Sequence, residues 1–192
     1  MPARYKGKSG FVERAGGGGK CGSLPPCQDL QRGGKGRRGS GVTPEQVTHV
    51  VVTHGHSDHA GNLNLFPRAT LLVGFDLSRG RGLYLPQGLA SGAPLELHPG
   101  HLRVIPTPGH TRAHVALLAL GTRLGTVAVA GDTFERRGDA EEWGALSEDP
   151  RRQRRSRGRV VALANVIVPG HGEPFRVVKE WGDGGSEEEE EE

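Results

Sequence analysis

Seven histidine and aspartate side chains in this 192-residue chain have the types and spacing that suit a pair of metal ions. They are His54, His56, Asp58, His59, His110, Asp132 and His171. Zinc in enzymes prefers imidazole nitrogens and carboxylate oxygens, and a catalytic site keeps one position open for water. A single histidine near a strand end is usually an ordinary surface or core residue, but this many candidate ligands at ordered spacing are difficult to obtain by chance. The pattern therefore predicts a site for two zinc ions.

The run His54-Gly55-His56-Ser57-Asp58-His59 is expected to serve both ions. His54 and His56 are two residues apart at the end of a predicted strand, where a period of two places both rings on the same side. Gly55 allows the backbone to turn closely between them. Asp58 and His59 follow on the next turn and are displaced along the chain, so they suit the second ion.

The other three candidate ligands each come just after a short apolar run that predicts a strand. His110 follows residues 102–106, Asp132 follows residues 126–130, and His171 follows residues 166–168. A glycine directly before each of them allows close approach of the backbone, and strand ends hold side chains more rigidly than mobile loops do. We therefore expect all seven side chains to meet at one edge of the sheets.

Other elements can be predicted around these ligands. Further strands are expected at residues 47–53, 69–73 and 115–120, and helices at residues 59–66, capped by Asp58, and from about 147 to 164. Six arginines would spread around the second helix, which is typical of a solvated surface: Arg151, Arg152, Arg154, Arg155, Arg157 and Arg159. The remaining histidines of the ordered region lack the strand-end setting and receive no predicted role: His49, His98, His101 and His114.

Composition divides the chain into three parts. Residues 1–41 are rich in glycine and basic residues without apolar periodicity and are predicted to be disordered, residues 42–179 form one domain, and residues 180–192 are a disordered acidic tail. The body apart from this tail is basic, which suits a phosphate-rich substrate but also simple solubility. With only two cysteines, Cys21 and Cys27, the sequence predicts neither a disulfide framework nor a four-thiolate zinc site. Without an apolar run that could span a membrane, we expect a soluble intracellular protein.

From residue 42 to about 179, the motifs resemble those of the metallo-beta-lactamase superfamily. The resemblance rests on the H-x-H-x-D-H run, the later His110, Asp132 within Gly-Asp-Thr, and His171 within Pro-Gly-His-Gly. It implies an α/β fold, the αβ/βα sandwich. It also implies that His54, His56 and His110 hold the first zinc ion, that Asp58, His59 and His171 hold the second, and that Asp132 bridges both.

The N-terminal segment departs from the pattern of this superfamily. Members normally begin with several strands and a strand that ends in an Asp-Thr-Gly turn beneath the metal site, and residues 1–41 contain none of these. We therefore expect the sandwich to be incomplete at the N-terminus, with its first strands missing or replaced.

The expected chemistry is hydrolysis by an activated water. Two zinc ions can acidify a water molecule toward neutral pH and stabilise charge on an attacked phosphorus or carbonyl group. The expected catalytic residues are Asp58, which would orient the water or handle its proton, and Asp132, which would hold the ions together.

Three functions are open. Residues 53–65, 84–86, 131–135, 145–150 and 168–177 resemble one vertebrate branch of the superfamily. That resemblance implies a zinc-dependent endoribonuclease with an RNA substrate, the 3′ end of histone pre-mRNA, acting in cytosol and nucleus as a homodimer. The alternatives are a thioesterase like glyoxalase II and a zinc-binding or interaction protein that is inactive because of the N-terminal truncation.

Overall fold

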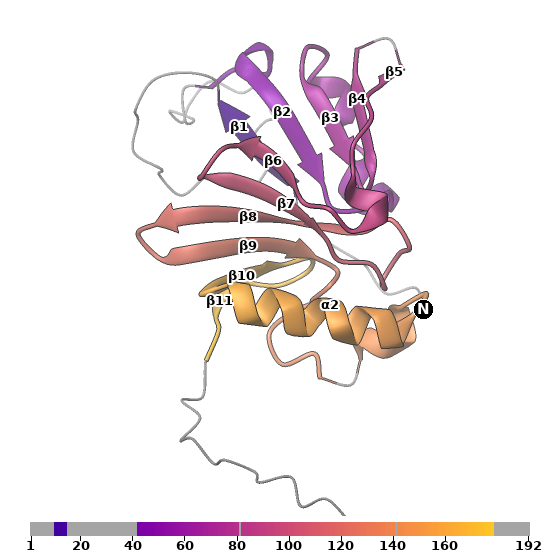
Figure 1. Ribbon diagram of the computed structural model, residues 1–192, viewed down its shortest axis with the longest axis vertical. Helices are drawn as coiled ribbons and strands as arrows, with labels where there is room; N and C mark the ends of the chain where they lie inside the picture. Colours follow the sequence, from indigo (N-terminus) through magenta and orange to yellow (C-terminus); the bar gives the residue numbers. More distant parts are fainter. Residues whose placement is uncertain (1–9, 15–41, 81, 141, 179–192) are drawn as a thin grey trace, which may run out of the picture.

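Two sheets packed face to face, with one long helix outside the second sheet, make up the computed structural model, which describes residues 10–14, 42–80, 82–140 and 142–178 (Figure 1). The first sheet has the order β1 (Gly10–Arg14), β2 (Val47–Val52), β3 (Thr70–Val73), β4 (Asp76–Arg79) and β5 (Leu83–Tyr84). The second has the order β11 (Phe175–Arg176), β10 (Val166–Pro169), β9 (Gly125–Gly131), β8 (Val115–Thr122), β7 (Leu102–Pro106) and β6 (Leu95–His98). The helices are α1 (Ser57–Ala60), α2 (Pro150–Leu163) and the 3-10 turns η2 (Pro44–Gln46), η3 (Leu63–Leu65), η4 (Leu89–Ser91) and η5 (Trp143–Leu146).

The inner strands β7 to β10 of the second sheet are largely buried on both faces, which explains why they are mostly apolar. Successive side chains of a strand point to opposite faces. Val104 and Leu117 therefore face the first sheet, where they pack in one cluster with Leu72. Their neighbours Ile105 and Leu118 face the other way and pack against α2. The order of layers is thus first sheet, second sheet, helix.

Strand direction brings the predicted ligands to one edge. β9 and β10 are parallel, and α2 lies in the connection between them. β7 runs in the same direction as β9, because both are antiparallel to β8. The carboxyl ends of these three strands therefore meet at one edge of the second sheet, and His110, Asp132 and His171 follow directly after them.

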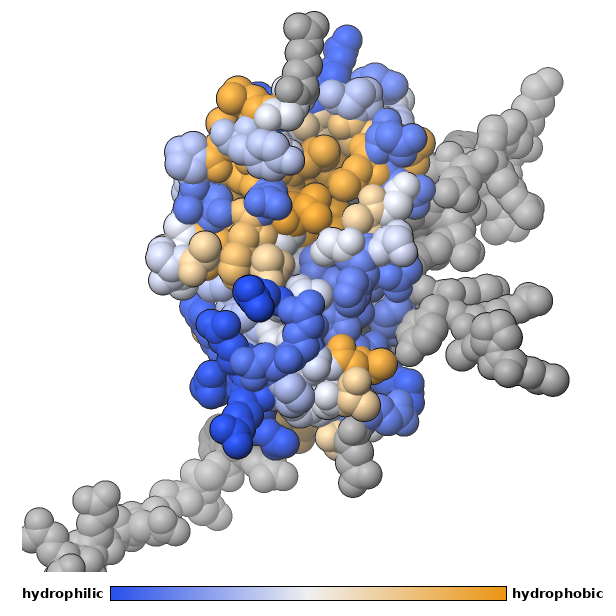
Figure 2. Space-filling view, turned by 90° about the vertical axis from the view of Figure 1, so that its right-hand side faces the viewer, coloured by the Kyte–Doolittle hydropathy of each residue, from blue (hydrophilic) through white to orange (hydrophobic). Residues whose placement is uncertain are grey.

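In the described part of the chain, a loop rather than a long helix covers the outer face of the first sheet. Val47, Val50 and Val52 pack there with Phe66 and Ala69 from the loop that includes η3. Figure 2 shows apolar residues gathered at the surface over the half of the molecule where this sheet lies. No helix within the described ranges has the length and apolar character needed to cross a membrane.

The structure confirms the strands predicted next to the ligands and the second helix. That helix begins after Asp149, whose side chain accepts the backbone N–H of Arg152, and Pro150 occupies its first turn. The first helix was placed wrongly: α1 ends at Ala60, and the short turn η3 follows it. Gly61 and Asn62 are poor helix formers, which explains why the helix ends before them.

The N-terminal segment requires a correction. Residues 10–14, which were expected to be disordered, form β1 and pair antiparallel with β2 from Gly10↔Val52 to Arg14↔Val47. A five-residue strand is too short to show periodicity within a glycine-rich segment, and the open edge of β2 offers it a row of backbone partners. The rest of the segment, including Cys21 and Cys27, and the predicted acidic tail lie outside the described residues.

Candidate metal centre

All seven predicted ligands lie together, between the two sheets at their common edge. His54 follows β2 of the first sheet, and His56 precedes α1, which carries Asp58 and His59. The other three follow β7, β9 and β10 of the second sheet. The side chains form two adjoining groups, one of His54, His56, His110 and Asp132 and one of Asp58, His59 and His171.

In the first group, three imidazole nitrogens and one carboxylate oxygen face a common point. His54 Nε2 lies 2.9 Å from His56 Nδ1, and His110 Nε2 lies 3.2 Å from the same atom. Asp132 Oδ2 lies 3.6 Å from His54 Nε2 and 3.2 Å from His110 Nε2.

The second group is built in the same way and shares Asp132. His59 Nε2 lies 3.5 Å from Asp58 Oδ2 and 3.2 Å from Asp132 Oδ1. His171 Nε2 lies 3.7 Å from Asp58 Oδ2 and 3.3 Å from Asp132 Oδ2. The two oxygens of Asp132 therefore reach both groups, which is the geometry of a bridging carboxylate.

These distances fit zinc. Ligand atoms placed tetrahedrally around an ion at about 2.1 Å lie roughly 3.4 Å from one another. The distances between ligand atoms given above range from 2.9 to 3.7 Å, on both sides of this value. The donor set of imidazoles and carboxylates is also the one that zinc prefers.

The charges of the site are strongly coupled. Burial, together with the neighbouring histidines, lowers the pKa of His54 to about 2, although the Asp132 carboxylate acts in the opposite direction. Burial would raise the pKa of Asp132, but hydrogen bonds from His171 and His59 and the charges of the histidines outweigh it and lower that pKa. The hydrogen bond to Asp132 raises the pKa of His171. The site therefore keeps Asp132 ionised and His54 neutral, the forms that bind metal.

Close backbone approach at two glycines makes this arrangement possible. A Cβ atom at Gly170 would lie 1.8 Å from Asp132 Oδ1. Gly131 has a φ of +49°, and a Cβ atom there would lie 2.3 Å from Thr53 Oγ1. The glycines that precede Asp132 and His171 are thus required by the packing around the ligands.

His114, which received no predicted role, belongs to the surroundings of the site. Its ring is fully buried and stacks on His54 at 4.9 Å between centroids. Its Nδ1 lies 2.9 Å from Thr107 Oγ1 and 3.3 Å from Thr133 Oγ1. Burial lowers the pKa of His114 to about 3. The other three histidines without a predicted role are in neither ligand group.

Glu135 was also missed by sequence reasoning. Its side chain is buried beside His110 and His171, and together with Asp132 and His171 it makes a further group of possible metal ligands. Burial raises the pKa of Glu135 to about 7, and the Asp132 carboxylate adds to the effect. Only its position three residues after the predicted ligand Asp132 could have drawn attention to it.

The arginines of α2 do not all lie on a solvated surface. Five are exposed, but Arg157 is largely buried and binds both carboxylate oxygens of Asp139, at 2.9 and 2.5 Å. It also donates to the backbone oxygen of Thr133 at 2.9 Å and lies over the ring of Phe134. The prediction of a solvated role is therefore wrong for Arg157, because this side chain braces the loop that carries Asp132.

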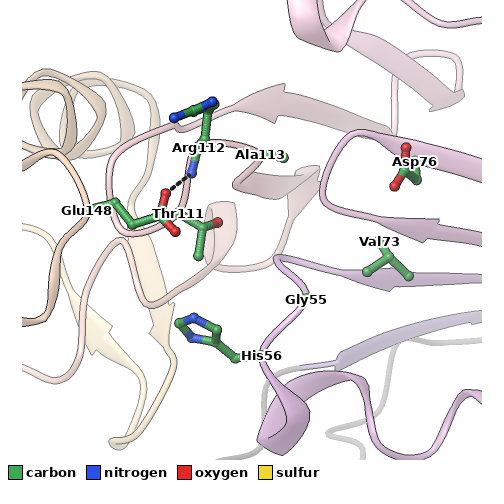
Figure 3. Close-up of a pocket in the computed structure, with 8 residues that line it drawn as sticks. All are labelled: Gly55, His56, Val73, Asp76, Thr111, Arg112, Ala113 and Glu148. Carbon is green, nitrogen blue, oxygen red and sulfur yellow. Dashed lines mark hydrogen bonds between the residues drawn. The ribbon is translucent and has the colours of Figure 1, made fainter.

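Two hollows adjoin the ligands. A cavity of about 180 Å³ is lined by His56, Asp58, His110, Asp132, Glu135, Leu146 and His171. His56 also lines a more open groove of about 740 Å³, which Figure 3 shows between Gly55, Val73 and Asp76 on one side and Thr111, Arg112, Ala113 and Glu148 on the other. Glu148 accepts the backbone N–H of Arg112 at 2.9 Å across one end of it. His56 lines both hollows, so the groove adjoins the predicted ligands.

Comparison with known proteins gives a consistent result. Residues 32–75 match the family model described as the metallo-beta-lactamase superfamily. The human metallo-beta-lactamase domain-containing protein 1 is 59% identical over 74% of this chain and 53% of its own length. The protein of the same name from Xenopus laevis is 56% identical over 72% of this chain and 60% of its own length. The chain thus spans little more than half the length of these relatives.

The fold resembles that of solved structures at low sequence identity. A structure described as a probable metal-dependent hydrolase from Staphylococcus aureus superimposes with a TM-score of 0.54, covering 69% of this chain and 57% of the other. The two sequences are 20% identical.

Proposed function

This chain belongs to the metallo-beta-lactamase superfamily, and from that premise we propose that it is a metal-dependent hydrolase with two zinc ions. The observation that carries the proposal is the pair of ligand groups that share Asp132, one formed with His54, His56 and His110 and the other with Asp58, His59 and His171. A mononuclear structural site would close four ligands around one ion, whereas this set has enough donors for two ions and an open side at the cavity.

The residues of the chain have separable roles in this proposal. When bound, two zinc ions supply Lewis acidity and acidify a water molecule toward neutral pH. Asp132 reaches both ligand groups and fixes the distance between them. The Asp58 side chain is 36% exposed and lines the cavity, so it can orient the attacking water and accept its proton.

For the substrate, we propose RNA and phosphodiester hydrolysis. The support is the resemblance of several sequence stretches to the vertebrate branch noted above, which implies processing of the 3′ end of histone pre-mRNA. Cations for a polyanion come from Arg112, which lines the groove beside the carboxylates of Asp76 and Glu148, and from the exposed Arg151 and Arg152 at the start of α2. An extended strand of RNA fits an open groove better than a closed pocket.

Metal analysis and two activity assays on one preparation test this proposal. We expect two zinc ions per chain, cleavage of single-stranded RNA that chelation stops and zinc restores, and no thioester hydrolysis. Thioester hydrolysis without RNA cleavage would replace the proposal with a glyoxalase II-like activity. Bound zinc without either reaction would make the chain a metal-binding protein that is not catalytic.

Location and assembly are proposed on the same resemblance. We propose that the protein acts in the cytosol and nucleus and forms a homodimer. Fluorescence microscopy of the tagged chain and light scattering of the purified chain check these two points. A monomer at micromolar concentration would exclude a stable dimer.

A further inference from the structure

Glu135 is not one of the seven predicted ligands, although its carboxylate is buried beside them. Its side chain is 5% exposed, and it forms part of the wall of the cavity. Oε1 has no hydrogen-bond partner among the described residues. A buried carboxylate oxygen costs free energy unless it accepts a hydrogen bond or meets a cation. We therefore expect a hydrogen-bond donor or a cation close to Glu135 Oε1.

His110 offers such a donor. Its Nε2 faces the first ligand group, at 3.2 Å from both His56 Nδ1 and Asp132 Oδ2. Its Nδ1, on the other side of the ring, is buried and also lacks a hydrogen-bond partner within the described part of the chain. Glu135 Oε1 lies 3.7 Å from this atom. A shift of less than about 1 Å would make an ordinary hydrogen bond between the two.

The backbone holds Glu135 in this place. Its N–H donates to Asp139 Oδ2 at 2.8 Å, and its carbonyl oxygen accepts the N–H of His171 at 2.9 Å. Asp139 is itself bound by Arg157 of α2. The residue is therefore anchored to the helix on one side and to the last predicted ligand on the other, and its side chain has little freedom to turn away.

We propose that Glu135 is a positioning residue of the metal centre: its carboxylate accepts the Nδ1–H of His110 and so directs His110 Nε2 toward the first ion. This inference rests on the zinc site of the proposed function. Metal-binding histidines commonly donate their second N–H to a carboxylate, which fixes the tautomer and the orientation of the ring.

The variants Glu135→Leu and Glu135→Gln test the role, with the exposed Glu173→Leu as a matched control. Titration with zinc against a competing chelator measures the two binding steps. In Glu135→Leu we expect one step to weaken by about 10- to 100-fold and the other to change little. Glu135→Gln keeps a carbonyl oxygen that can accept the same N–H, so it should recover most of the affinity. The control should match the wild type.

A second measurement reads the hydrogen bond without zinc or activity. Nitrogen-15 NMR of the histidine rings, with His110 assigned through a His110→Gln variant, reports which nitrogen carries the proton. In the zinc-free wild type we expect the Nδ1–H form of His110, and in Glu135→Leu a mixture of both forms.

Several outcomes would overturn the inference. These are unchanged zinc affinity and an unchanged tautomer in Glu135→Leu, weakening of the step assigned to the second ion alone, or the Nε2–H form in the zinc-free wild type. If Glu135→Leu does not fold, the wild-type tautomer decides the question. If the wild type binds no zinc, the proposed function fails, and the tautomer still reports on Glu135.

Discussion

Asp132 and the five imidazoles around it are the residues whose charges matter most. Ring nitrogens that face one another at 2.9 to 3.2 Å repel when protonated, and burial adds to the cost of charging them. The Asp132 carboxylate lies 3.2 Å from His59 Nε2 in one group and 3.2 Å from His110 Nε2 in the other. The metal-free site is therefore a set of imidazoles around the ionised carboxylate of Asp132, ready to take up cations.

Two residues of the site can be removed without disturbing the core. His56 and Asp58 are exposed, so His56→Ala and Asp58→Ala should change the free energy of unfolding of the zinc-free chain by less than about 1 kcal/mol. Hydrolysis should fall at least about 100-fold in each, because each loses a predicted ligand. Urea unfolding and RNA cleavage are measured on the same samples. The exposed Ser57→Ala, between them, is the control, and retained hydrolysis in either variant would contradict the assignment.

The buried histidines should make the zinc-free protein sensitive to acid. The pKa of His114 is about 3 in the folded chain and about 6.5 when the chain is unfolded. Between these two pH values only the unfolded state binds the proton. The contribution of the neutral His114 ring to stability is therefore complete above pH 6.5 and is lost as the pH falls. Each buried histidine whose pKa is lowered in this way should reduce the free energy of unfolding by about 1 kcal/mol for each pH unit of acidification in this range.

Urea unfolding of the zinc-free chain between pH 6.5 and 5 measures this slope. His114→Gln removes one of the titrating groups and should reduce the slope by about one proton. An identical slope in the variant would mean that His114 is charged in the folded chain.

At the scale of the elements, the loop from Gly131 to Asp139 is the piece on which the site depends. It leaves β9 with a ligand, passes Glu135, and is tied to α2 through Arg157. Gln153 of the same helix donates to the backbone oxygen of Asp132 at 2.8 Å. The helix between two parallel strands therefore acts as the support of a ligand loop in addition to covering the sheet.

Breaking the ion pair of this loop should be costly. Arg157→Leu leaves Asp139, which is 2% exposed, without its cation, and should destabilise the chain by about 3 to 5 kcal/mol. The double variant Arg157→Leu/Asp139→Leu removes the stranded charge and should recover part of this loss. Urea unfolding gives the free energies. Arg155→Leu on the exposed face of α2 is the control. If Arg157→Leu and Arg155→Leu lowered the free energy of unfolding equally, Arg157 would have no bracing role.

Gly131 tests the close packing of the strand end. Gly131→Ala would add a Cβ atom at 2.3 Å from Thr53 Oγ1, next to His54, and would also strain a backbone with positive φ. Gly138→Ala has the same kind of strain, at φ +74°, but meets nothing within 4 Å. We expect about 1 to 2 kcal/mol of destabilisation in Gly138→Ala and more in Gly131→Ala, together with weakened zinc binding only in the latter. Equal stability of both variants would show that the contact is unimportant.

For the whole molecule, the site is a joint between two sheets. Ligands from the end of β2 and from α1 meet ligands from the ends of β7, β9 and β10. The sheets otherwise meet through the apolar cluster that contains Val51, Leu72, Val104 and Leu117. Bound ions would therefore add a second connection between the layers, at their edge.

Zinc should stabilise the entire fold through this joint. An ion that binds only the folded state at 100 times its dissociation constant contributes about 2.7 kcal/mol. We expect a higher melting temperature with zinc and slower hydrogen exchange where β2 and β9 end, with little change in the β6–β7 hairpin. Asp132→Ala should lose most of both effects. Zinc-independent exchange at the end of β2 would argue against a site that spans the sheets.

The candidate ligands could be predicted from the sequence because they follow strands that their own apolar residues predict. The apolar runs before His54, His110, Asp132 and His171 are long enough to predict strands, and ligands at strand ends are fixed by the direction of the chain. The short strands β4, β5, β6 and β11 could not be predicted in this way. They are partly polar and two to four residues long, and pairing with a neighbouring strand decides them.

The residues that surround and support the predicted ligands became apparent only in the tertiary structure. Nothing in the neighbours of Glu135, His114 or Arg157 along the chain distinguishes them from surface residues. Their roles arise from burial against residues distant in sequence, as with Arg157 and Asp139 or His114 and His54. Spacing along one chain can encode which residues follow a strand, whereas the partner of a buried charge depends on how separate elements pack, and only the folded molecule specifies that.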